Sequence, residues 1–187
     1  MSINHSLITD YTQTLDVCLK RIDLCHVSLQ FFSKLGFSKI AVCIPDAALD
    51  GKLVVRLSYG IPEASNNILK AGKLGKVAAF EAYKRHKQIH VCHFPSQNTY
   101  ARTDLELHAA IEAAVYLPLI SSRSGRLEGL LIAGNDQQTD FPQDLIETAE
   151  FMAQTFADHL SRHPVKLEHQ QEELELEIQV LTPSQEF

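Results

Sequence analysis

The chain has 187 residues, of which 45% are hydrophobic and 21% charged, with four cysteines, no tryptophan and a formal net charge of −6 at pH 7. This composition is typical of a globular domain, and it excludes collagen-like and intrinsically disordered chains. No apolar run approaches the roughly 20 residues of a membrane-spanning helix, and residues 1–10 lack the basic and apolar regions of a signal peptide. We therefore expect a cytoplasmic protein whose cysteines are free thiols.

Charge is concentrated at the C-terminal end of the chain. Residues 164–187 hold one lysine and six glutamates, a net charge of −5, so residues 1–163 carry only −1. Nucleic-acid binding depends on a concentrated basic surface that displaces counterions from phosphates. We therefore expect neither a nucleic acid nor a membrane as a direct partner.

The N-terminal part predicts one long amphipathic helix over residues 6–35, ended by Gly36. Its apolar residues recur at alternating spacings of three and four, which is a heptad pattern. Two of them are cysteines, which suit a packed interface and lie too far apart along one helix to form a disulfide. The heptad positions are Ile8, Tyr11, Leu15, Cys18, Ile22, Cys25, Leu29 and Phe32.

The middle of the chain predicts short strands and helices separated by turns. Runs rich in β-branched residues indicate strands, and apolar residues at helical spacing indicate helices. Cys43 lies in the first strand, so we expect it to be buried and inert. In chain order the predicted elements are a strand at 37–45, a turn at 46–51, a strand at 53–57, a helix at 72–85, a strand at 88–92, a loop at 94–103 and a helix at 105–111.

Two apolar runs, Ala114–Ile120 and Leu127–Ala133, predict a central hairpin. The residues between them are polar and include Gly125, as a turn requires. Pro142 then suits the first turn of a helix. An apolar stripe continues that helix through Leu145, Ala149, Met152, Phe156 and Leu160.

The end of the chain keeps a heptad spacing. Leucines recur every seven residues from 160 to 181, but Pro164 and Gln171 interrupt the pattern. The segment is therefore either a coiled coil of about two heptads or a solvated acidic helix with a frayed end. We divide the chain into a domain at residues 1–162, which includes the N-terminal helix, and an acidic, partly heptad-patterned tail or linker at 163–187.

Three local strings, taken together, resemble a known family. They are AVYLPL at 114–119, LEGLLIA at 127–133 and FPQDL at 141–145. In this order they resemble the GAF domain, a small-molecule-binding and dimerising module of signalling proteins, over about residues 15–162. The resemblance implies an α+β fold, with an antiparallel sheet, the terminal helices on one face, and short helices and loops covering a pocket on the other. It also implies that Gly129 leaves room for a helix or a ligand to approach a central strand.

The resemblance does not name a cofactor, because this fold hosts many ligands and in some proteins none. The cyclic-nucleotide branch carries an Asn-Lys…Phe…Asp-Glu signature. This chain keeps Asn135, Phe141 and Asp144, but Asp136 replaces the lysine and Leu145 replaces the glutamate. The lost basic residue argues against a cyclic nucleotide.

The bilin-binding branch has a Cys-His pair shortly before the strand that contains the Val-Pro-like step. Here Cys92 and His93 form such a pair, but they precede Pro118 by 26 residues. We therefore do not expect a covalently bound bilin, and the pair is better explained as structural.

A third branch of the family is enzymatic. Free methionine-R-sulfoxide reductases use several loop cysteines, whereas segments 75–79 and 94–104 contain none here, and only Cys92 lies near the expected pocket. A metal site is not expected either, because the one cluster of potential ligands lacks the paired spacing of zinc sites. That cluster comprises His86, His90, Cys92, His93 and His108.

The candidate ligand-binding residues gather around the loop at 94–103. A pocket for a small polar or aromatic molecule needs a few directed donors and a ring over an apolar floor. The loop and its neighbours supply both, and no catalytic residue is assigned. The candidates are Cys92, His93, Asn98, Tyr100, Arg102, His108 and Tyr116.

The expected function is that of a non-catalytic sensory domain in signal transduction. Its heptad-patterned helices would form a homodimer, and the state of the pocket would bias the last helix. That helix would act on an output domain or a partner protein, for example in transcription regulation. The alternatives are a dimerisation scaffold without a ligand and a thiol- or metal-dependent enzyme on the same fold.

Overall fold

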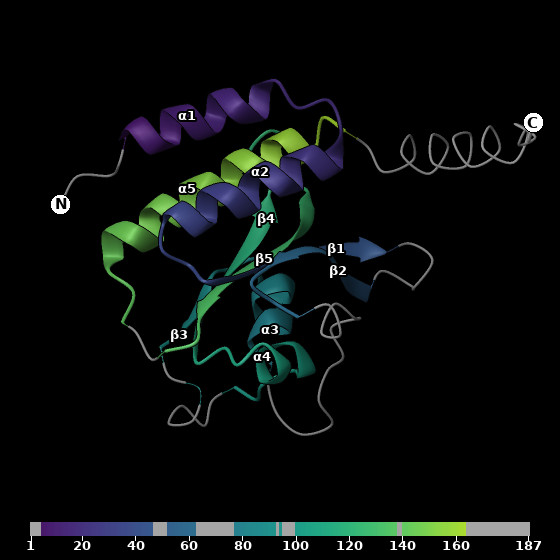
Figure 1. Cartoon of the computed structure of the whole chain (residues 1–187). Helices are drawn as coiled ribbons and strands as arrows, with labels where there is room; N and C mark the ends of the chain where they lie inside the picture. Colours follow the sequence, from purple (N-terminus) through teal and green to yellow (C-terminus); the bar gives the residue numbers. More distant parts are fainter. Residues whose placement is uncertain are drawn as a thin grey trace, which may run out of the picture.

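The computed structural model describes residues 5–46, 52–62, 77–92, 94, 100–137 and 140–163. Five strands form one antiparallel sheet in the order β2-β1-β5-β4-β3 (Figure 1). The strands are β1 (Lys39–Asp46), β2 (Lys52–Tyr59), β3 (Ile89–Val91), β4 (Ala113–Ile120) and β5 (Leu127–Asn135). The helices are α1 (His5–Asp16), α2 (Arg21–Lys34), α3 (Ala78–Arg85), α4 (Asp104–His108) and α5 (Gln143–Leu160).

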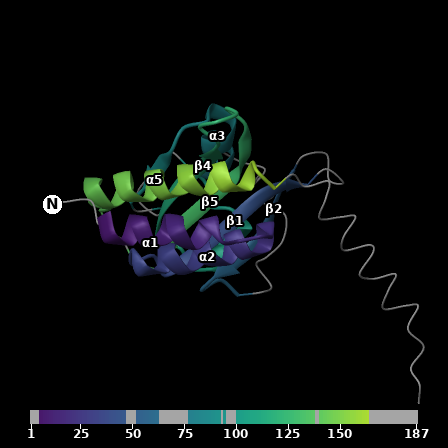
Figure 2. The ribbon, with the colours of Figure 1, turned by 90° about the horizontal axis from the view of Figure 1, so that it is seen from above.

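Helices cover both faces of the sheet. α2 and α5 pack on one face, α3 and α4 on the other, and α1 lies over α2 and α5 as an outer layer (Figures 1 and 2). Alternate residues of a strand point to opposite faces, so Val115 and Leu117 join the core under α2 and α5, while Ala114 and Tyr116 join the core under α3 and α4. The α+β fold with its terminal helices on one face is therefore confirmed.

The N-terminal heptad pattern forms two helices, so the prediction of one helix over residues 6–35 is wrong. The chain leaves the helix after Asp16, and α2 begins at Arg21, after Lys20 in an extended conformation (φ −118°, ψ 149°). Val17 and Leu19, in the connection, are 75% and 83% exposed.

The reversal is explained by what α1 buries. The hydroxyl of Tyr11 lies 2.8 Å from Oγ of Ser28, and the ring centroids of Tyr11 and Phe31 are 5.2 Å apart. In a continuous helix Tyr11 and Ser28 would be about 25 Å apart, at 1.5 Å per residue. Folding back thus buries Tyr11 and Leu15 against α2 and α5. This burial outweighs the local preference for an uninterrupted helix.

The break between α1 and α2 also invalidates the argument made above against a disulfide between Cys18 and Cys25. The argument that Cys18 and Cys25 are too far apart for a disulfide assumed that both lie on one helix, whereas Cys18 lies in the connection and Cys25 in α2. Cys18, Cys25, Cys43 and Cys92 are all free thiols, as expected, and Cys43 is completely buried in β1.

The remaining elements follow the sequence closely. Both predicted hairpins form, as β1–β2 and β4–β5. α4 is shorter than the predicted 105–111, because Ala110 adopts a left-handed conformation (φ 53°) and the N–H of Ile111 donates to the carbonyl oxygen of Glu106 at 2.9 Å. Within the described ranges, no helix is long and apolar enough to cross a membrane.

Some predictions fall outside the described residues. The helix predicted at 72–85 is described from Ala78 onward, and positions 72–76 are not described. Half of the predicted loop, at 95–99, lies outside as well, and so does the heptad pattern of the tail at 164–187.

Candidate functional site

A buried polar cluster lies between the sheet and α4. Tyr116 of β4 is fully buried and donates through its hydroxyl to Oε1 of Glu106 at 2.8 Å. The backbone N–H and the hydroxyl of Thr103 donate to the other carboxylate oxygen, which makes Thr103 and Glu106 the capping box that starts α4. Both carboxylate oxygens of Glu106 are therefore hydrogen-bonded.

Tyr116 is held in its neutral form by this environment. Burial raises its pKa well above the usual value, and the adjacent Glu106 carboxylate raises it further. Its hydroxyl is already engaged by Glu106, so a ligand that used this predicted site residue would have to replace an internal hydrogen bond.

Two further predicted site residues lie on the same face of the sheet. Nη2 of Arg102 lies 2.7 Å from Oε2 of Glu112, and the guanidinium stands 5.2 Å from the ring centroid of Phe94. Tyr100 is partly buried and packs against the same apolar core. The structure thus brings Tyr100, Arg102 and Tyr116 together on the face covered by α3 and α4.

The other predicted site residues are placed differently. Cys92 follows β3 and is half-buried, and burial, followed by a hydrogen bond with Asp140, raises the pKa of its thiol. His108 is exposed at the end of α4. His93 and Asn98 lie outside the described residues. Among the described side chains, no three of His, Cys, Asp or Glu are grouped closely enough to hold a metal ion.

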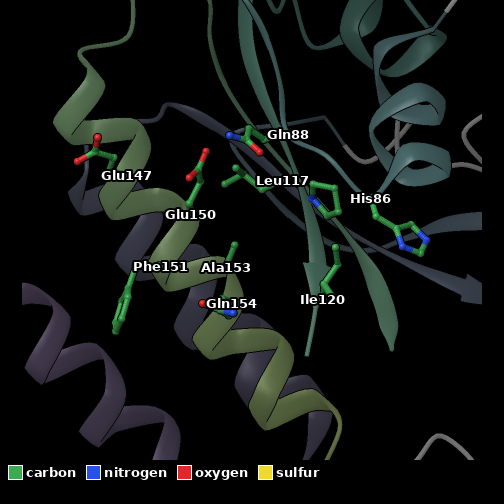
Figure 3. A pocket seen from close by; sticks show the side chains of 10 residues that line it. His86, Gln88, Leu117, Ile120, Glu147, Glu150, Phe151, Ala153 and Gln154 are labelled. Carbon is green, nitrogen blue, oxygen red and sulfur yellow. The ribbon is translucent and has the colours of Figure 1, made fainter. Parts of the chain in front are cut away.

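An open groove lies at the edge of the sheet, between α5 and the end of α3, with a volume of about 460 Å³ (Figure 3). Its floor is the outer edge of β4, one wall is α5, and the other is the connection between α3 and β3. Its described lining residues are His86, Gln88, Leu117, Pro118, Ile120, Glu147, Glu150, Phe151, Ala153 and Gln154. Sequence reasoning missed this groove, although the unequal lengths of the predicted strands at 88–92 and 114–120 were a signal of an open edge.

The end of α5 is fastened to its surroundings by polar contacts. Asp158 accepts hydrogen bonds from the hydroxyl of Ser121 at 2.9 Å and from the backbone N–H of Ser122 at 2.7 Å, both in the β4–β5 turn. Arg21, at the start of α2, donates to the carbonyl oxygens of Leu160 at 2.9 Å and His163 at 2.6 Å. The last turn of α5 is therefore joined both to the sheet and to α2.

Arg21 also faces a buried carboxylate of the sheet. Its Nη1 lies 3.9 Å from Oε2 of Glu128 in β5, and both side chains are about 5% exposed. A buried charge is tolerated when it is paired and hydrogen-bonded. Arg21 thus connects α2, β5 and the end of α5 at one point.

No protein-family model matches the sequence, and no curated protein matches it. Solved structures do match. The GAF domain of an Acinetobacter phosphoenolpyruvate-protein phosphotransferase is similar at a TM-score of 0.70, with 12% identity over 87% of this chain and 95% of that one. The GAF domain of a phosphoenolpyruvate-protein phosphotransferase from Coxiella burnetii gives a TM-score of 0.67. The identity is 16%, over 90% of this chain and 94% of that one. The chain has the fold of a GAF domain.

The GAF fold also occurs in an enzyme that this chain resembles. Free methionine-R-sulfoxide reductase from Neisseria meningitidis, in complex with its substrate, gives a TM-score of 0.63, with 12% identity over 83% of this chain and 86% of that one. At such identities the likeness concerns the fold alone. The fold that the strings at 114–119, 127–133 and 141–145 predicted is confirmed.

One expectation that came with the GAF resemblance needs correction. A Cβ placed on Gly129 would lie 2.4 Å from the carbonyl oxygen of Cys43 in β1. The missing side chain therefore admits the backbone of the neighbouring strand, where a helix or a ligand was expected.

Proposed function

We propose that this chain is a non-catalytic sensory domain that forms a homodimer through its terminal helices and relays ligand occupancy through α5 to an output domain or a partner protein. The GAF fold supports a sensory role, since several structural neighbours are sensor domains. The proposed relay is supported by two sets of hydrogen bonds at the end of α5, one to the β4–β5 turn and one to Arg21 of α2. A displacement of the β4–β5 turn acts on Asp158, and a displacement of α2 acts on Leu160 and His163 through Arg21.

The packing of α1 determines which surface a second copy would contact. Because α1 covers α2 and α5 within the chain (Figure 2), the dimer would use the outer side of this helical layer. Three large apolar side chains, Val17, Leu19 and Phe151, are exposed there or in the α1–α2 connection. Exposed apolar groups of this size are common in protein interfaces.

Two buried or half-buried thiols support the non-catalytic assignment. Burial raises the pKa of Cys43 far above its usual value and also raises that of Cys92. A nucleophilic cysteine requires a thiolate, which these environments disfavour. We therefore expect no reduction of free methionine-R-sulfoxide by the purified chain with dithiothreitol. Turnover that is lost in Cys92→Ser would replace this proposal by the enzymatic alternative.

Native mass spectrometry of the whole chain tests the sensory proposal directly. A dimer that carries an additional small mass supports it, whereas a dimer that stays bare after incubation with cell extract supports a dimerisation scaffold. A bare monomer at micromolar concentration would contradict the proposal.

The dimer surface is tested with a pair of charge substitutions. Leu19→Glu should weaken the dimer by about tenfold or more, because a charge would be buried at the contact. Leu107→Glu is the matched control, since Leu107 is 55% exposed on α4, on the opposite side of the sheet. Equal weakening by both substitutions would rule out the helical layer as the interface.

A further inference from the structure

The groove beside α5 exists because β3 is shorter than its neighbour. β3 has three residues and pairs only with Ala114–Tyr116, whereas β4 continues for four more residues to Ile120. In the described part of the chain, no strand pairs with the outer edge of Leu117–Ile120. His86 ends α3 in a left-handed conformation (φ 54°) and forms the far wall of the groove.

The walls of the groove combine apolar and acidic character. In Figure 3, Glu150 and Ala153 of α5 point toward the side of Leu117 of β4, and Gln154 also lines the groove. The described lining includes two glutamates and neither lysine nor arginine. A cation with an apolar body would complement this surface.

Two polar atoms between α5 and β3 lack a hydrogen-bond partner. Oε1 of Glu150 and Nε2 of His90 are buried, and neither is hydrogen-bonded within the described residues. Ile89 and Val91 of β3 face the core under α3 and α4, so His90 faces α5, as residues alternate along a strand. The Glu150 carboxylate therefore lacks a compensating positive charge or donor among the described residues, and a cation bound in the groove beside this partly buried side chain would supply one.

The open edge does not suit an extended peptide. Pro118 lies at the middle of this edge, opposite Leu130 of β5. A proline within a sheet is tolerated where its nitrogen faces an unpaired edge, and there it cannot donate to an added strand. A small molecule therefore fits the groove better than a peptide strand does.

We propose that this groove binds a small organic cation, an alkylamine or alkylguanidine, whose N–H groups pair with the carboxylate of the partly buried Glu150 while its apolar chain lies on Leu117 and Ile120. The site lies at the open edge of β4 beside α5, whereas Tyr100, Arg102 and Tyr116 lie on the face covered by α3 and α4. This inference names a ligand class for the proposed sensory function. Binding of the cation does not depend on that function, but the expected consequence of binding, a shift of α5, does.

The test is an NMR titration of the ¹⁵N-labelled full chain with agmatine and cadaverine. Both cations should shift the amide resonances of Leu117, Leu119 and Ile120 and those of 150–154. The neutral 1-pentanol and the anionic valerate have chains of similar length and should bind at least about tenfold more weakly, because a charge-assisted hydrogen bond is worth about this factor. Equal binding of all four compounds, or no binding of either cation at millimolar concentration, would overturn the proposal.

Two substitutions at matched positions localise the effect. Glu150→Gln keeps the shape and removes the charge, and it should weaken agmatine binding by about tenfold or more. Glu147→Gln makes the same change one turn earlier, where Nε2 of Gln143 already donates to Oε1 of Glu147 at 3.1 Å, and it should weaken binding by less than about threefold. The reverse order of the two effects would contradict the assignment of Glu150.

A third variant covers the case in which Glu150→Gln does not fold. Gln154 is exposed on α5 and lines the groove, so Gln154→Lys should fold and should abolish agmatine binding by charge repulsion. Unchanged binding in this variant would place the cation elsewhere. Concentration-dependent broadening of 117–120 without any amine would show that a second copy, and not a cation, occupies the edge.

The same titration separates this inference from the proposed relay. Binding that shifts 117–120 but leaves the resonances of Asp158, Arg162 and His163 unchanged would overturn the relay and keep the site. Absence of binding would overturn the site, while the relay would still be judged by the native mass spectrum and any co-purifying ligand.

Discussion

His159 and Asp16 join the last turn of α5 to the last residue of α1. Nε2 of His159 lies 2.9 Å from Oδ1 of Asp16, and its Nδ1 lies 2.8 Å from the carbonyl oxygen of Thr155. Both partners are acceptors, so the ring forms both hydrogen bonds only when both nitrogens carry a hydrogen. This contact between two distant side chains holds α1 where it covers α2 and α5.

The first prediction concerns the acid side of this contact. The hydrogen bond from His159, with a smaller contribution from Arg162, holds the pKa of Asp16 below its usual value. Stability from this group is therefore present above about pH 4, the value in the unfolded chain, and is lost as the pH falls through the folded value. A ¹³C NMR titration should show a higher Asp16 pKa in His159→Gln and a smaller rise in Arg162→Gln. No change in either variant would contradict the assigned cause.

The second prediction concerns the anchor between α5 and the β4–β5 turn. Burial opposes ionisation of Asp158, but hydrogen bonds from Ser122 and Ser121 outweigh it and lower its pKa. Asp158→Asn should therefore destabilise the protein by about 1 kcal/mol at pH 7, and by less at pH 3, below the unfolded pKa of about 3.9, where the stability that comes from the lowered folded pKa is being lost. Urea denaturation at both pH values measures this. The exposed Asp136→Asn serves as the control and should change stability by less than about 0.5 kcal/mol.

The third prediction concerns the bond that holds α1 on α2. Tyr11 and Ser28 are both buried, so Tyr11→Phe leaves the Ser28 hydroxyl without its partner and should cost about 1–2 kcal/mol. Adding Ser28→Ala should restore part of that loss, because no polar group then remains unsatisfied. Tyr59→Phe, at a tyrosine that is 50% exposed, should be nearly neutral. Denaturant unfolding of the wild type and the three variants would contradict the assignment if the double variant were the least stable.

The fourth prediction concerns alkaline stability. Burial raises the pKa of Tyr11 and Tyr116 far above that of a free tyrosine. A folded pKa above the unfolded one gives stability that is present below about pH 10 and lost as the pH rises further, because the unfolded chain ionises first. Absorbance at 295 nm should therefore show Tyr11 and Tyr116, two of the five tyrosines, ionising together with unfolding. Gradual ionisation of both in a chain that keeps its far-UV circular dichroism would contradict this.

The local elements of this fold could be predicted because their signals are local. Residues 114–120 and 127–133 are apolar, β-rich runs around a polar turn, and they form β4 and β5 almost as predicted. The stripe from Leu145 to Leu160 forms α5, since helical spacing by itself determines which residues share a face. The same strings supported the GAF resemblance, which the structural comparisons confirm at the level of the fold.

Only some positions of the candidate site residues could be predicted. Tyr100, Arg102 and Tyr116 lie on one face of the sheet, as expected from the resemblance, whereas their role in binding a ligand stays a prediction. The sequence could not indicate that the Tyr116 hydroxyl is taken by Glu106, ten residues earlier, since the geometry that joins them depends on how α4 packs on β4.

The amino-acid sequence by itself determined the strands, the turns, the apolar faces and the acidic tail composition, because these depend on neighbours a few residues apart. Only the tertiary structure decided that residues 5–34 fold back as two helices, that the edge of β4 stays open beside Glu150, and that Arg21 holds the end of α5. Each of these results from burial or from contacts between distant segments, such as the 139 residues that separate Arg21 from Leu160. The heptad pattern at 8–32 was compatible with one helix or two, and the free energy of burying Tyr11 and Leu15 selected the second.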